Sequence, residues 1–129
     1  CFMREKLEQL LKNAYCPYSH FPVSAIVVMK DGTEFCGVNV ENASYGAGIC
    51  AERSAILSAV SHGYRKGDFR HLYVMVNRDQ MSTCCFACRQ VISEFFEDDV
   101  KITCFGKKEE KTFTKKELCP YPFDEDDLK

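Results

Sequence analysis

Three cysteines and one glutamate form the pattern in this chain that could do chemistry. Glu52 lies two residues after Cys50, and Cys85 and Cys88 form a C-x-x-C pair further along the chain. A structural zinc ion usually takes four protein ligands, whereas a catalytic zinc takes three and leaves one position for water. Three thiolates beside a carboxylate therefore predict an enzyme that holds one zinc ion per chain.

Glu52 is the predicted catalytic residue. Zinc lowers the pKa of a bound water to about 7, and a neighbouring carboxylate can accept that proton and deliver it to a substrate. A glutamate in the first turn of a helix is also favourable simply because of the helix dipole. The position of Glu52, two residues from a ligand of a three-ligand site, favours the catalytic interpretation.

Both ligand groups are expected at helix N-termini. Apolar residues at helical spacing predict one helix over 50–62, which starts at Cys50, and another over 86–96, which starts just after Cys85. Helix N-termini stabilise thiolates and lower their pKa. Cys85 and Cys88 are one helical turn apart, so both sulfurs can face the same point. Two parallel strands would bring the two helix starts together at the carboxyl edge of a sheet.

The remaining elements follow from hydrophobic periodicity and turn signals. We expect a first helix over 2–15, a hairpin with strands over 23–30 and 33–40, strands over 71–77 and 100–105, and then a possible small strand and a short capped helix beginning at Thr114. Lys107–Lys116 is expected to be a solvated turn or helix face. The alternation predicts one α/β domain over 1–129, a three-layer α/β/α sandwich around a central mixed sheet of about five strands.

Composition limits the partners and the compartment. A formal net charge of −2 argues against a nucleic-acid surface, and the longest apolar run, Ala25–Met29, is too short to span a membrane. Nine cysteines without a signal-peptide pattern fit a closed disulfide framework poorly, so we expect the reducing cytoplasm. The six cysteines outside the pattern are expected to be core or surface residues: Cys1, Cys16, Cys36, Cys84, Cys104 and Cys119.

Two arginines and two histidines bear on alternative interpretations. Arg53 and Arg89 each follow a ligand motif and could hydrogen-bond the sulfurs; the sequence favours this role for Arg53 and does not decide it for Arg89. A redox dithiol would explain the C-x-x-C pair but would leave Cys50 and Glu52 unexplained. A purely structural zinc module would need a fourth ligand, for which His62 and His71 are the candidates.

These motifs resemble those of the small zinc cytidine deaminases, the homotetrameric type with three cysteine ligands. The resemblance rests on 50–53, read Cys-Ala-Glu-Arg, and on 85–90, read Cys-Phe-Ala-Cys-Arg-Gln. It extends to 18–25, 37–45 and 117–123, and so covers nearly the whole chain. Zinc deaminases use a Cys₃ ligand set and a glutamate that is not itself a ligand.

The resemblance implies the hydrolytic deamination of cytidine and 2′-deoxycytidine to uridine and 2′-deoxyuridine, with release of ammonia, in pyrimidine salvage. Cys50, Cys85 and Cys88 would hold zinc while Glu52 carries protons to N3 of cytosine and to the departing ammonia. The implied substrate contacts are the ribose-binding pair Asn39 and Glu41, the base-packing Phe21, and also Tyr45, Ala51 and Phe123. Phe123 would come from a neighbouring subunit of a homotetramer.

Three residues depart from the family pattern. Cys84 stands where proline is usual, and Phe86 and Ser24 stand where glycine is usual. Cys84 and Cys88 are also one turn apart, but the Arg-Gln pair after Cys88 favours Cys85 as the ligand. With Phe at position 86, the backbone there should not adopt a positive φ, which favours glycine.

Two other kinds of deaminase substrate remain to be weighed. A deaminase for a nucleoside-like antibiotic such as blasticidin S shares these motifs. The net negative charge of the chain disfavours a polynucleotide substrate.

Overall fold

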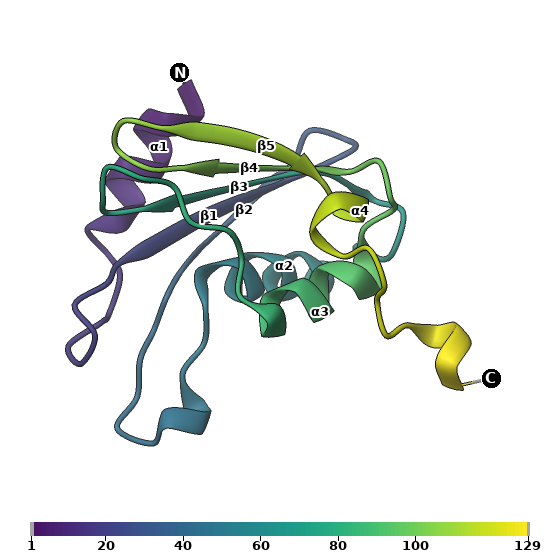
Figure 1. The fold of residues 1–129 in the computed structure, drawn as a ribbon, viewed down its shortest axis with the longest axis horizontal. Helices are drawn as coiled ribbons and strands as arrows, with labels where there is room; N and C mark the ends of the chain where they lie inside the picture. The colour runs from purple at the N-terminus through teal and green to yellow at the C-terminus, as the bar shows by residue number, and fades with distance from the viewer. Residues whose placement is uncertain (1, 129) are drawn as a thin grey trace.

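A five-stranded mixed sheet forms the centre of the fold (Figure 1). The computed structural model describes residues 2–128, so the expectation for Cys1 lies outside the described residues. The strands lie in the order β2-β1-β3-β4-β5, with bounds β1 (Val23–Met29), β2 (Glu34–Val38), β3 (Phe69–Val76), β4 (Lys101–Phe105) and β5 (Glu110–Thr114). Only β3 and β4 pair in parallel; the other neighbouring strands are antiparallel.

Helices cover both faces of this sheet. On one face lies α1 (Phe2–Leu11), and on the other lie α2 (Ala51–Ser61) and α3 (Phe86–Phe95) (Figure 1). The side chains of β1 alternate between the two cores: Ile26 packs in the cluster that contains Leu7 of α1, and Ala25 packs in the cluster that contains Ile56 of α2. The predicted three-layer α/β/α sandwich with a mixed sheet is confirmed.

The first helix is shorter than predicted, because a tertiary contact ends it. Helix α1 stops at Leu11, and the next three N–H groups bond carbonyls three residues back, which tightens the last turn. The N–H of Tyr15 then donates to the carbonyl of Asn39 at 3.0 Å, and Tyr15 pairs with Val40. The chain therefore leaves the helix to lie beside the end of β2.

The charged run near the C-terminus was expected to be a solvated turn or helix face, and the structure corrects this. Residues Glu110–Thr114 form the edge strand β5, which pairs with β4. Helix α4 (Lys115–Leu118) follows directly, and Thr114 and Glu117 form the predicted capping box. Short 3₁₀ helices cover Tyr45–Ala47 (η1) and Glu125–Leu128 (η2). Within residues 2–128, every helix is too short or too polar to cross a bilayer.

Helix α2 approaches β2 very closely, and Gly37 makes this possible. A Cβ atom at Gly37 would lie 2.5 Å from the carbonyl oxygen of Ala51 and 2.6 Å from the backbone nitrogen of Ala55. These are backbone atoms of α2, so they can recede only if the whole helix moves. Gly37 thus sets the position of the N-terminus of α2, where Cys50 and Glu52 lie.

We expect Gly37→Ala to lower the free energy of unfolding by about 3 kcal/mol, the upper part of the usual range for overpacked cores. Gly46→Ala is the matched control, because nothing lies within 4 Å of a Cβ at that position. It should change stability by less than about 0.5 kcal/mol. Urea unfolding measures both, and equal stability of the two variants would contradict the proposed close contact.

Candidate active site

The structure brings three cysteine sulfurs together at the starts of two helices. The Sγ atom of Cys50 lies 3.7 Å from that of Cys85, and the Sγ atoms of Cys85 and Cys88 are 3.4 Å apart. All three ligand atoms lie within 4.8 Å of one another. Cys50 and Cys85 are the N-cap residues of α2 and α3, and Cys88 lies in the first turn of α3.

This arrangement follows from the direction of the strands. Both β2 and β3 run antiparallel to β1, which lies between them, so β2 and β3 point the same way. Helix α2 follows the carboxyl end of β2, and α3 follows that of β3. The two helix starts therefore meet at one edge of the sheet, where ligand sites of open α/β sheets usually form.

The three sulfurs fit a zinc ion. Thiolates bound to tetrahedral zinc at about 2.3 Å lie about 3.8 Å from one another, close to the separations found here. Within residues 2–128, no histidine or carboxylate belongs to this group of possible ligand atoms. The ring of His62 bonds the carbonyl of Ser58, and that of His71 bonds Thr103. Three donors without a fourth favour an open, catalytic kind of zinc site over a closed structural one.

Hydrogen bonds favour a thiolate at Cys50. The thiol of Cys88 and the guanidinium of Arg53 both donate to its sulfur, and together they lower the pKa of Cys50 to about 5. The Nη2 atom of Arg53 lies 3.6 Å from this sulfur. The same hydrogen bond and burial raise the pKa of Cys88, so Cys50 loses its proton first. Arg53 thus occupies the predicted position beside the sulfurs.

Glu52 is a buried carboxyl beside the cysteines. It is only 5% exposed and lies at the second residue of α2. Burial raises the pKa of this carboxyl, and the nearby charge of Cys50 raises it further. The thiols of Cys84 and Cys88 also contact the carboxyl group. A carboxyl with a raised pKa holds a proton more readily than an ordinary glutamate, which suits a group that accepts a proton and then returns it.

Cys84 lies outside the group of three sulfurs, but it is not isolated. It is buried, and its thiol contacts Glu52 and the thiol of Cys104 on β4. Neither contact was predictable from the sequence, because no local spacing relates the loop before α3 to β4 or to α2. Phe86 is accommodated as the first residue of α3, and its φ is not positive. Ser24 is buried, and its hydroxyl donates to the carbonyl of Leu7.

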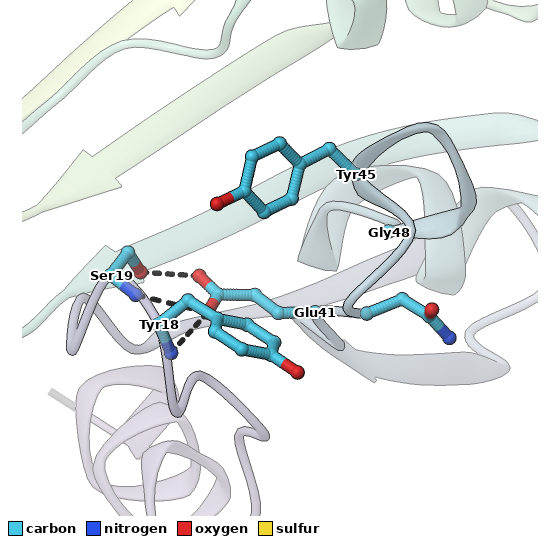
Figure 2. A pocket seen from close by; sticks show the side chains of 6 residues that line it. Tyr18, Ser19, Glu41, Tyr45 and Gly48 are labelled. Atoms are coloured by element: carbon cyan, nitrogen blue, oxygen red, sulfur yellow. Dashed lines mark hydrogen bonds between the residues drawn. The ribbon is translucent and has the colours of Figure 1, made fainter.

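A pocket of about 390 Å³ lies between the loop before β1 and the loop before α2 (Figure 2). Its lining includes Glu41 and Tyr45, with Tyr18 and Ser19 opposite. The carboxylate of Glu41 accepts hydrogen bonds from the backbone N–H groups of Tyr18 and Ser19 and from the Ser19 hydroxyl. These bonds lower the pKa of Glu41, so it stays ionised. The anchoring role of Ser19 had no signal in the sequence.

Of the other residues predicted to bind substrate, Asn39 lies beside the same loops, whereas Ala51 lies in α2 and Phe123 lies against α3. The side chain of Asn39 accepts from the N–H of Val23 and donates to the carbonyl of Phe21, both at 2.9 Å. It keeps one N–H and one lone pair for a ligand. Ala51 is fully buried at the start of α2, next to Cys50. Phe123 is half exposed, and its carbonyl accepts from Gln90 of α3.

Comparisons with known proteins agree with this geometry. Residues 2–104 match the family model described as the cytidine and deoxycytidylate deaminase zinc-binding region. A probable cytidine deaminase from Dictyostelium discoideum is 43% identical, with 89% of this chain and 77% of that protein covered. A cytidine deaminase from Sporosarcina psychrophila is 41% identical, with 91% and 85% covered.

The solved structures are similar over nearly the full chain. The crystal structure of cytidine deaminase from Burkholderia pseudomallei superposes with a TM-score of 0.88 at 38% identity, covering 92% of this chain and 94% of that one. The fold and the cluster of three cysteines are those of a class of α/β hydrolases whose family model describes a zinc-binding region. The chain belongs to the cytidine and deoxycytidylate deaminase family, and the predictions of an enzyme and of this family are confirmed.

The neighbouring cysteines Cys84 and Cys85 allow a matched test of the metal site. Cys85→Ala removes a sulfur that lies within 4 Å of two others, so the purified variant should lose its zinc. Cys84→Ala removes a thiol outside the group and should retain one zinc ion per chain. Elemental analysis of both variants measures this. Zinc retained in Cys85→Ala and lost in Cys84→Ala would contradict the ligand assignment.

Proposed function

We propose that this chain catalyses the hydrolytic deamination of cytidine and 2′-deoxycytidine to uridine and 2′-deoxyuridine, with release of ammonia. The observation that carries the proposal is the buried carboxyl of Glu52 beside three clustered sulfurs at paired helix starts. Membership of the deaminase family supports the same reaction. The products would serve pyrimidine salvage.

In the proposed mechanism, Cys50, Cys85 and Cys88 hold one zinc ion. Bound there, zinc would supply the Lewis acidity that allows water to lose a proton near neutral pH. Glu52 accepts that proton, because its raised pKa suits proton exchange. Glu52 then protonates N3 of the cytosine ring as the water oxygen adds to C4. Glu52 then takes the remaining proton of the hydroxyl on C4 and transfers it to the amino group, so that the C4–N bond breaks, ammonia leaves and the C4 carbonyl of uracil forms.

Glu41 and Asn39 are proposed to bind the ribose hydroxyls. Both side chains point from the end of β2 toward segment 18–23, as their i, i+2 spacing predicts. The ionised Glu41 can accept hydrogen bonds from two hydroxyls while Ser19 holds it in place. Phe21 would pack on the base, and Tyr45 would close the pocket from the other side (Figure 2).

A homotetramer is proposed as the working form, with each active site completed by a neighbouring subunit. Large aromatic side chains on the loop before α2 and on the C-terminal segment are exposed, among them Tyr45 at 85% and Tyr121 at 97%. The C-terminal segment extends past α3, away from the sheet (Figure 1). In this position Phe123 could reach the pocket of a neighbouring subunit.

The proposed compartment is the reducing cytoplasm, which the free cysteines suit.

The Glu52→Gln variant tests the proton-carrying role. It keeps the size and polarity of the side chain but cannot accept a proton, so turnover of cytidine should fall by about 10²- to 10⁴-fold, the usual contribution of general acid–base catalysis. The loss of absorbance of the cytosine band measures turnover. The variant should keep one zinc ion per chain. Full activity would rule out the assignment, and loss of zinc would make Glu52 a ligand.

The Glu41→Gln variant tests the ribose contact. Hydrogen bonds to a charged group are worth about 1.5–3 kcal/mol, so KM for cytidine should rise by about 10- to 100-fold while kcat changes little. Ser19→Ala is the control, because it removes the loop bond to Glu41 and keeps the carboxylate. Steady-state kinetics of both variants separate the two roles. An equal rise in KM would mean that Glu41 only anchors the loop.

A further inference from the structure

Arg89 connects two segments that are far apart in the sequence. Its Nε atom donates to the carbonyl of Cys84 at 2.8 Å, and Nη2 donates to the hydroxyl of Thr83 at 2.9 Å. On the other side, Nη1 donates to the carbonyl of Leu118 at the end of α4 at 3.2 Å. One guanidinium thus joins the residues directly before Cys85 to Leu118, the last residue of α4, from which the C-terminal segment 119–128 continues.

The bonds from Arg89 act on the last residues of an irregular segment. Residues 77–85 form neither helix nor strand, although they end at one of the three clustered sulfurs. Cys84 occupies the position just before that sulfur, and unlike a proline it does not fix its own φ angle. The two bonds from Arg89 restrict this backbone from outside. They act one and two residues before Cys85.

The guanidinium itself is held in one orientation. It lies over the ring of Phe86, 4.6 Å from the ring centroid. Phe86 and Arg89 are three residues apart on α3, as are Cys85 and Cys88, so the two pairs lie side by side on the same turn. The planar fork of arginine can bond several acceptors at once from a fixed plane, which a lysine cannot do.

Arg53 and Arg89 therefore act on different partners. Arg53 donates to the sulfur of Cys50, whereas the three bonds of the Arg89 side chain end on oxygen atoms. A lysine at position 89 would keep the positive charge, but it could not bond the same backbone and hydroxyl oxygens at once.

We propose that Arg89 is a positioning residue that fixes Cys85 for metal binding by bonding Thr83 and Cys84, and that it ties this loop to the C-terminal segment through Leu118. The proposal rests on the zinc site of the proposed function. It concerns metal affinity, so it can be tested in the absence of any nucleoside.

The test measures the affinity of the purified chain for zinc by competition with a chromophoric chelator. Partners of metal ligands typically contribute 10- to 100-fold to metal affinity, so Arg89→Met should weaken zinc binding by about this factor. Arg65→Met is the matched control, because Arg65 also donates to two carbonyls, those of Val60 and Tyr64, at the opposite end of α2. It should leave zinc affinity unchanged.

Arg89→Lys separates geometry from charge. It keeps the positive charge but loses the fork, so its zinc affinity should stay below that of the unmodified chain by about tenfold. Zinc affinity in Arg89→Met equal to that in Arg65→Met would overturn the proposal, and so would full affinity in Arg89→Lys. Cytidine turnover of the unmodified chain is measured separately. Its absence would reject the proposed function and leave the affinity result standing.

Discussion

Helix α2 lies directly against β2 because Gly37 presents no side chain at the point of contact. This contact determines how far the N-terminus of α2 extends over the edge of the sheet. Cys50 and Glu52 lie at that N-terminus, and α3 brings Cys85 and Cys88 from the neighbouring strand pointing the same way. A shift of α2 would therefore separate the first sulfur and the carboxyl from the other two sulfurs. The packing of one glycine limits the geometry of the whole site.

Much of this architecture was predictable because its signals are local. The hairpin turn at Asp31–Gly32, the apolar strands and the helical periodicity after Cys50 each involve residues close in the sequence. The ligand motif was visible for the same reason, since one helical turn separates Cys85 from Cys88. The burial of Glu52 had not been predicted, because it depends on how α2 packs against the rest of the fold.

The features that the sequence did not reveal depend on contacts between distant segments. The end of α1 is set by the pairing of Tyr15 with Val40, not by the composition of the helix. Ser19 meets Glu41 across 22 residues, and Arg89 meets Leu118 across 29. The contact of Cys84 with Cys104 likewise joins a loop to β4. Periodicity and capping rules describe neighbours along the chain, so they do not report such pairs.

The supply of sulfurs by two separate helices has a thermodynamic consequence. An unfolded chain would not hold Cys50 near Cys85 and Cys88, so an ion bound by all three would bind the folded state in strong preference. The affinity for the ion would then add directly to the free energy of unfolding, and a chelator would act as a denaturant. An ion bound at this edge of the sheet would also link the N-terminus of α2 to that of α3. Under metal limitation, the amount of folded protein would fall together with its activity.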